Sequence, residues 1–171
     1  MKYLPLFVDI QNKPCVVIGG GGIASRKADL LLGCGAQVRV ISPQLGDEMQ
    51  RFANDGRVEW LQREYQQGDL QDAWLVIAGT ASDDINRQVA DEAERLKIPC
   101  NAVSDASIGN YIMPSIIDRD PVQIAVTTGG ASPVLARLIR TNLESCTPSA
   151  YGNLAKLVEG YRQPVKQAFP K

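Results

Sequence analysis

The chain has 171 residues, which is enough for one full domain with a short appendage and for a sizeable buried core. Its 18 basic residues nearly balance its 19 acidic residues, so the charge indicates neither a nucleic acid nor a membrane surface as a partner. No stretch approaches the roughly 20 apolar residues of a membrane span, and Pro5 and Asp9 interrupt what would be the apolar part of a secretory signal, so we expect a cytoplasmic protein.

The chain has four cysteines and no histidine. The cysteines are widely spaced and form no C-x-x-C pair, which argues against a zinc site and a redox pair, so we expect no metal site built from protein ligands. Acid–base chemistry must therefore use a carboxylate, a hydroxyl, a lysine or the substrate itself.

Apolar runs alternate with helical patterns up to residue 103. Strands are predicted at residues 15–18, 38–41, 58–61, 74–78 and 99–103. The segments between several of them repeat apolar residues on one helical face: Ala24, Ala28, Leu31 and Leu32; then Leu45, Met49, Phe52 and Ala53; then Ile85, Val89, Ala93 and Leu96. This alternation predicts an α/β fold, a Rossmann-type parallel sheet with right-handed crossovers.

The pattern changes after residue 110. Two β-like runs, residues 111–117 and 122–128, flank a turn-rich tetrapeptide and predict a β-hairpin outside the parallel sheet. Ser132 and Pro133 then predict the N-cap and the first position of a helix, which Pro148 ends before a last amphipathic stretch. We therefore expect three parts, over residues 1–110, 111–147 and 148–171.

A glycine-rich loop follows the first predicted strand and opens the first predicted helix. Gly19, Gly21 and Ala24 fit the pattern G-x-G-x-x-A. In that pattern the first glycine allows a tight turn, the second lets a pyrophosphate approach the backbone, and the small third residue lets the helix pack closely on the strand. The loop predicts dinucleotide binding at a helix N-terminus; the alternative is a glycine turn without a ligand.

The end of the second strand bears on which dinucleotide binds. A Rossmann NAD site usually has an acidic residue there, but this chain has Ser42, Pro43 and Gln44. Ser42 and Gln44 can hydrogen-bond a ribose. Arg39 would favour the 2′-phosphate of NADP if it reached the site, whereas a solvent-directed Arg39 would not. We expect NAD, with NADP left open.

Arg26 and Lys27 lie near the start of the first helix, where positive charge opposes the helix dipole. This placement has two interpretations: a contact with a ligand, or charges that are simply solvated.

Five segments together resemble the siroheme synthase family, in its precorrin-2 dehydrogenase/sirohydrochlorin ferrochelatase module. They are residues 4–7 (LPLF), 19–27 (GGGGIASRK), 101–103 (NAV), 111–119 (YIMPSIIDR) and 127–137 (TTGGASPVLAR). The last two are the most specific, and the resemblance runs over essentially the whole chain.

The resemblance implies a homodimer with an NAD-binding domain over residues 1–110, a dimerisation segment over 111–147 and the start of a helical part over 148–171. It implies NAD-dependent oxidation of precorrin-2 to sirohydrochlorin and, in many members, insertion of Fe²⁺ as a substrate. Cofactor contacts would fall on Gly22, Ile23, Pro43 and Gln44.

One departure from the family concerns the base. The family's catalytic aspartate follows the strand that corresponds to residues 101–103; this chain has Ser104 there, and Asp105 comes next. A shift of one residue turns an extended side chain to the opposite face, so Asp105 can serve only if the chain bends. Asp105 is the candidate base because it lies just past a parallel strand; the alternative is a turn aspartate bonded to its own backbone.

The tetrapyrrole carries many carboxylates, so its cleft should offer hydrogen-bond donors. Residues 127–132 lead into a helix N-terminus, which favours anions, and in the family a hydroxyl residue at position 128 can be phosphorylated. The candidate substrate residues are Asn101, Ser115, Thr128, Gly129, Gly130, Ser132 and Arg137. The alternative is an N-capped helix start with solvated arginines.

Three functions remain open on the sequence. The first is the dehydrogenase, with or without chelatase activity. The second is a tetrapyrrole chelatase or binding protein without dehydrogenase activity, motivated by Ser104. The third is a non-catalytic module that senses dinucleotides, against which the two specific segments argue.

Overall fold

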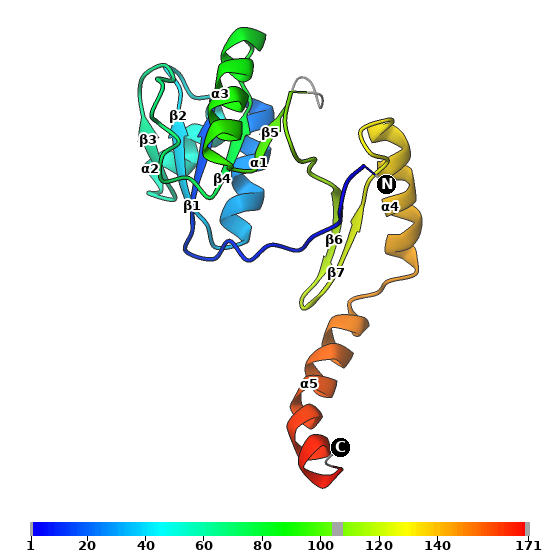
Figure 1. Ribbon diagram of the computed structural model, residues 1–171. Helices are drawn as coiled ribbons and strands as arrows, with labels where there is room; N and C mark the ends of the chain where they lie inside the picture. Colours follow the sequence, from blue (N-terminus) through cyan, green and yellow to red (C-terminus); the bar gives the residue numbers. More distant parts are fainter. Residues whose placement is uncertain (1, 104–107, 170–171) are drawn as a thin grey trace. The chain divides into compact units, whose positions relative to one another are not determined.

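A computed structural model of the chain describes residues 2–103 and 108–169. It divides into two compact units, residues 1–112 and 113–171, each of which is described by itself (Figure 1). The two candidate catalytic residues, Ser104 and Asp105, lie outside the described residues.

The first unit is a five-stranded parallel sheet, which confirms the predicted Rossmann-type fold. Its strands are β1 (Pro14–Ile18), β2 (Gln37–Ile41), β3 (Val58–Leu61), β4 (Leu75–Ala78) and β5 (Cys100–Ala102), in the order β3-β2-β1-β4-β5 (Figure 1). Its helices are α1 (Gly22–Gly33), α2 (Asp47–Asn54) and α3 (Asp83–Leu96). The strand order reverses at β1, and ligands of such sheets bind beyond the carboxyl ends of the strands at this reversal.

Both faces of this sheet are covered. Alternate residues on one face, such as Val16 and Val76, form a cluster with Val89 and Ala93 of α3. The intervening residues of the central strands are also fully buried: Cys15, Val17, Val40 and Ile77. Burial on both sides explains why these strands are continuously apolar in the sequence.

The crossover between β3 and β4 contains no helix and is held by polar contacts instead. Arg63 donates two hydrogen bonds to the carboxylate of Asp69, at 2.7 and 2.8 Å. The buried carboxylate of Glu92, on α3, accepts hydrogen bonds from the Tyr65 hydroxyl and, at 2.8 Å, from the Gly68 N–H. These contacts fix the segment beside α3.

The second unit consists of the predicted hairpin, β6 (Ser115–Arg119) and β7 (Val122–Val126), followed by α4 (Pro133–Ser145) and α5 (Ala150–Ala168). β6 begins at Ser115 rather than at Tyr111, and it runs to Arg119 through half of the predicted turn. The Tyr111 N–H and carbonyl are bonded to β5 residues instead, and Pro114 has no N–H for a ladder.

Few side chains of the second unit are buried. Ile117 is 1% exposed and Ala136 is 6% exposed. Most apolar residues of α4 and α5 are exposed: Val134, Leu135, Leu138, Ile139, Leu143, Tyr151, Leu154, Leu157, Val158, Tyr161 and Val165. Over residues 2–103 and 108–169, no helix has the length and apolarity needed to cross a membrane.

Candidate functional site

The glycine loop touches two neighbouring loops at the carboxyl edge of the sheet. Gly19 has φ +114°, and a Cβ at this position would lie 2.5 Å from the Gly79 carbonyl oxygen, just after β4. A Cβ at Gly20 would lie 2.2 Å from the Gln44 carbonyl oxygen, just after β2. Only glycine permits either approach, so these two residues build the loop.

The next two glycines face open space. A Cβ added at Gly21 or Gly22 would meet no atom within 4 Å. α1 begins here, so its first N–H groups have no partner within the helix. Ala24 is fully buried, and a Cβ placed at Gly79 would lie 3.4 Å from the Ala24 Cβ. The loop therefore fits the pyrophosphate of a dinucleotide, with close helix–strand packing below it.

The loop after β2 is rigid but presents one open side chain. Ser42 is buried, and its hydroxyl donates to the Gln44 carbonyl at 2.7 Å. The Ser42 carbonyl accepts a hydrogen bond from the Trp60 indole at 2.9 Å. Because the Ser42 proton is used within the loop, its oxygen is left only as an acceptor. Pro43 and Gln44 are exposed, so Gln44 is the residue whose side chain is available to a ribose.

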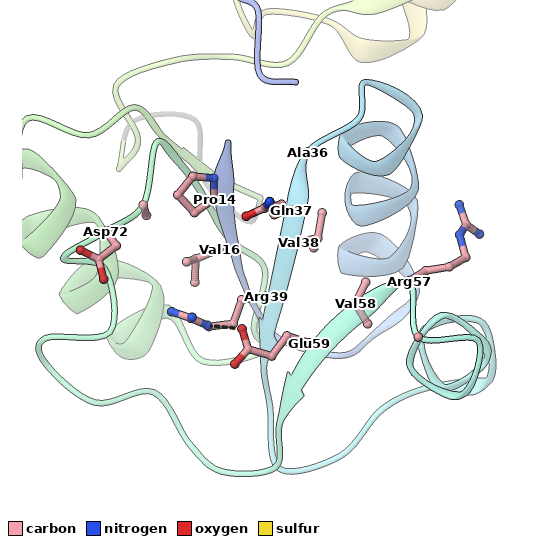
Figure 2. Close-up of a pocket in the computed structure, with 12 residues that line it drawn as sticks. Pro14, Val16, Ala36, Gln37, Val38, Arg39, Arg57, Val58, Glu59 and Asp72 are labelled. Carbon is pink, nitrogen blue, oxygen red and sulfur yellow. Dashed lines mark hydrogen bonds and ion pairs between the residues drawn. The ribbon is translucent and has the colours of Figure 1, made fainter. Parts of the chain in front are cut away.

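Arg39 lies within β2, two residues before the strand ends. Its guanidinium donates to the Glu59 carboxylate at 2.8 Å (Figure 2). The pair lines a hollow of about 430 Å³, together with Pro14, Val16, Gln37 and Asp72 among others. Most of this lining comes from the first half of the strands, so the hollow does not include the glycine loop. Arg39 is therefore engaged away from the end of β2 where a 2′-phosphate would lie.

The loop after β4 is a further part of the candidate site, and the sequence analysis did not predict it. Asn86, fully buried on α3, accepts hydrogen bonds from the Thr80 N–H at 3.0 Å and from its hydroxyl at 2.9 Å, and donates to the Thr80 carbonyl at 3.0 Å. Ser82 caps α3 by accepting from the Ile85 N–H. The signal in the sequence is an asparagine in the first turns of a helix that follows a Gly-Thr step.

The chain beyond β5 is tied back to that strand. The Val103 N–H donates to the Ala78 carbonyl at 2.9 Å. The Asn110 side chain accepts from the Cys100 N–H at 2.8 Å and donates to the Ile98 carbonyl at 3.2 Å. Asn101, a predicted substrate residue, is buried and donates to the Tyr111 carbonyl at 3.1 Å, so its amide group holds this connection.

Tyr111 buries its hydroxyl against β5. Among the described residues this oxygen has no hydrogen-bond partner, and burial raises the pKa of the Tyr111 phenol far above its ordinary value. The Tyr111 side chain therefore contributes to packing at this position and is not suited to carry a proton.

In the second unit the predicted anion loop closes on itself. The Thr128 hydroxyl donates to the Ser132 carbonyl and accepts from the Ser132 N–H, both at 3.0 Å. Gly129 and Gly130 have φ of +67° and +89°. Ser132 caps α4 by accepting from the Leu135 N–H at 3.1 Å. The structure thus brings Thr128 and Ser132 together at the start of α4.

Two other substrate candidates belong to the same unit. Ser115 is the first residue of β6 and is half-buried, opposite Val126 of β7. Arg137 is exposed one turn into α4. For metals, the described residues contain no group of three or more cysteine, aspartate or glutamate side chains placed to hold an ion.

Comparisons with known proteins agree with this geometry. The family model described as putative NAD(P)-binding matches residues 6–115, and the model for the central part of sirohaem biosynthesis proteins matches residues 119–145. A siroheme synthase from Saccharophagus degradans is 46% identical over 171 residues, covering 99% of this chain and 37% of that protein. One from Actinobacillus pleuropneumoniae serotype 3 is 43% identical, covering 100% of this chain and 35% of that protein.

The chain therefore spans about a third of the length of these curated relatives. Among solved structures, the precorrin-2 dehydrogenase SirC superposes with a TM-score of 0.76 at 24% identity, covering 94% of this chain and 79% of that one. This likeness shows that the two proteins share a fold.

Proposed function

Because the chain belongs to the putative NAD(P)-binding family, in the form that siroheme synthases carry, we propose that it oxidises precorrin-2 to sirohydrochlorin with NAD. The observation that carries the proposal is the open backbone at Gly21 and Gly22, above a fully buried Ala24. The reaction removes two hydrogens from precorrin-2: a hydride, which the nicotinamide accepts when NAD is bound, and a proton, which goes to a base.

The residues of the loop would bind and orient the cofactor. Backbone N–H groups at Gly22 and Ile23 would hold the pyrophosphate, because the helix dipole favours an anion there. Pro43 and Gln44 would contact the adenosine ribose. The ion pair of Arg39 with Glu59 supports NAD over NADP, since this guanidinium is already neutralised away from the ribose.

We propose Asp105 as the base that accepts the proton. The N–H of Val103, two residues earlier, is bonded to the end of β4, so Asp105 follows the carboxyl edge of the sheet within two residues. Replacing Asp105 with Ala should abolish turnover and leave NAD affinity intact. An unchanged rate would remove Asp105 from the mechanism, and Ser104→Asp would then test the family position.

The substrate would be held by donors on the second unit. Thr128, Gly129, Gly130 and Ser132 begin α4, and Arg137 adds a cation one turn later. These groups suit the carboxylates of a tetrapyrrole. A negative charge at position 128, as in Thr128→Asp, should lower substrate affinity; an unchanged affinity would contradict a substrate role for this loop.

We propose that the protein acts as a cytoplasmic homodimer assembled through residues 111–147 and the helix that follows. The support is the apolar surface of α4 and α5, which a second copy would cover. Cys15 and Cys100 are buried in strands, where they serve as small apolar side chains suited to a reducing compartment.

The experiment that tests the main proposal mixes the purified protein with enzymatically made precorrin-2 and NAD without metal. Sirohydrochlorin and NADH should appear in equal amounts. Tetrapyrrole binding without turnover would contradict the dehydrogenase and leave a binding protein. Cofactor binding without tetrapyrrole binding would leave a dinucleotide sensor.

Iron insertion is a second candidate activity, because the matched relatives are named for siroheme, which contains iron. Fe²⁺ would be a substrate held mainly by the macrocycle nitrogens. Adding Fe²⁺ to the sirohydrochlorin formed should accelerate the appearance of siroheme above the rate without protein, and an equal rate would exclude this activity.

A further inference from the structure

Lys27 lies on α1, one helical turn beyond the open glycines. It follows Ile23 by four residues, so the two side chains occupy the same side of the helix. Helical side chains lean toward the N-terminus, so the Lys27 side chain extends back over the turn that begins at Gly22. Its Cα–Cβ bond therefore points toward the end of the helix that faces the proposed pyrophosphate, and the ammonium can reach that end.

The opposite flank of α1 is already engaged. Asp29 pairs with Arg57, which precedes β3, at 3.3 Å. Two residues along a helix correspond to about 200°, so Lys27 lies on the far side of α1 from this ion pair. Since α1 also contacts β4, the Lys27 flank faces the half of the sheet that contains β4 and β5. The candidate base follows β5 in the sequence.

The Lys27 ammonium lacks a counter-charge within the part of the chain that the structure describes. No ion pair or hydrogen bond joins its side chain to residues 2–103 or 108–169, although the residue is half-buried. Burial, and secondarily the neighbouring Arg26 guanidinium, lower the pKa of Lys27. A half-desolvated ammonium without an anion is unfavourable, so its position costs stability in the free protein.

The first turn of α1 adds to the positive electrostatic potential around Lys27. It contains no acidic residue, whereas Asp47 and Glu48 begin α2, and Asp83 and Asp84 begin α3. Acids in the first turn normally complement the helix dipole. At α1 the positive end of the dipole, the Arg26 guanidinium and the Lys27 ammonium all contribute positive potential, and no acidic side chain in the first turn offsets it.

We infer that Lys27 binds an anionic oxygen of a ligand, either a phosphate oxygen of the dinucleotide at the glycine loop or a carboxylate oxygen of the tetrapyrrole. The identity of these ligands rests on the proposed function. The contact is a charge-assisted hydrogen bond, and the ligand supplies the counter-charge that the free protein lacks.

The test compares Lys27→Met, which keeps the length and removes the charge, with Lys27→Arg, which keeps the charge. Lys97→Met is the matched control, because Lys97 is exposed at the far end of α3. Three quantities are measured on each variant: the Kd for NAD, the Kd for sirohydrochlorin and the thermal midpoint of unfolding.

We expect Lys27→Met to weaken one of the two ligands about tenfold or more, as for loss of a charge-assisted bond. Lys27→Arg should restore most of that affinity. The midpoint of unfolding should stay level or rise, because an unpaired desolvated charge is gone. Loss of NAD affinity identifies the phosphate contact, and loss of sirohydrochlorin affinity identifies the carboxylate contact. The inference is overturned if both constants stay within about twofold of those of Lys97→Met.

Both affinities are measured without turnover. The proposed dehydrogenase activity and the proposed Lys27 contact can therefore be refuted independently of each other. A wild-type protein that does not oxidise precorrin-2, but whose ligand affinity depends on Lys27, removes the dehydrogenase and keeps the anion contact. An active enzyme whose affinities ignore Lys27 does the reverse.

Discussion

Residues 1–112 and residues 113–171 use their apolar side chains in opposite ways. In the first unit, the central strands and the facing sides of α1 and α3 are buried, with Val17, Val40 and Val76 at 0% exposure. In the second unit, Leu154, Leu157 and Val158 of α5 are 52–59% exposed. Full burial of one such side chain contributes about 1.5–3 kcal/mol. The first unit therefore contains its own core, whereas most apolar side chains of the second unit remain exposed.

The largest expected effect is a loss of stability in the first unit. Gly20→Ala places a Cβ 2.2 Å from the Gln44 carbonyl oxygen, so two backbone segments must separate. We expect the free energy of unfolding to fall by about 3 kcal/mol or more, measured by denaturant titration of the whole chain.

Gly22→Ala is the matched control, because its Cβ meets no atom within 4 Å. Its stability should equal or slightly exceed that of the wild type, since alanine favours the helix. Its affinity for NAD should nevertheless fall, because the methyl group occupies space the pyrophosphate needs. A stable variant with unchanged NAD affinity would contradict the assignment of the loop.

The next effect breaks the second unit alone. Gly152 lies against the hairpin, and a Cβ there would come within 1.9 Å of the Arg119 carbonyl oxygen. Gly152→Ala should destabilise the second unit by about 2–4 kcal/mol. Gly160→Ala, on the same helix but in open space, should instead stabilise it by up to about 1 kcal/mol. NAD affinity, which belongs to the first unit, should not change in either variant.

A smaller effect tests what covers α5. Leu157→Asp places a charge in the exposed apolar stripe, and we expect the dissociation constant of the homodimer to rise about 100-fold by analytical ultracentrifugation, equivalent to about 2.7 kcal/mol. Gln163→Asp adds the same charge on the opposite side of α5. Equal dissociation constants for the two variants would show that this stripe is not the interface.

The smallest effect refines the description of the first core. Tyr111→Phe removes a buried hydroxyl that has no partner among the described residues, so the free energy of unfolding should stay level or rise by up to about 1 kcal/mol. Tyr65→Phe removes a hydroxyl that donates to the buried Glu92 carboxylate, so it should cost about 1–3 kcal/mol. Chemical denaturation of both variants measures the difference, and a Tyr111→Phe variant as unstable as Tyr65→Phe would indicate that the Tyr111 hydroxyl has a partner.

Much of the fold could be predicted because local signals agree with one another. The apolar run at residues 15–18, the glycines that follow and the helical repeat from Ala24 together specify a strand, a turn and a helix. The start of β6 was predicted four residues early, because Tyr111 and Ile112 have strand-like side chains but the Tyr111 backbone bonds to β5. Periodicity reports side-chain type and carries no information on a backbone partner such as Cys100, eleven residues away.

The candidate site was only partly accessible from the sequence. The pattern G-x-G-x-x-A identified the tight turn at Gly19 and the open backbone at Gly21, since its spacing reflects backbone needs. The sequence left open whether Arg39 is solvated or directed at a ligand; its partner is Glu59, 20 residues away. The bonds between Asn86 and Thr80, and the use of the Ser42 proton within its own loop, depend on tertiary contacts that no local pattern encodes.

The tie between Asn110 and β5 has a consequence for how chemistry can vary on this scaffold. The Val103 N–H is bonded to β4 and the Asn110 side chain to β5, so the segment that joins these two residues starts and ends at anchored positions. Closing a short loop between fixed ends costs little additional entropy when residues inside it change. We therefore expect substitutions at positions 104 and 105, where the proposed base lies in the sequence, to alter proton transfer with little effect on folding. The proposed reactive group is then an exchangeable part, which mutation can vary while the nucleotide-binding fold stays the same.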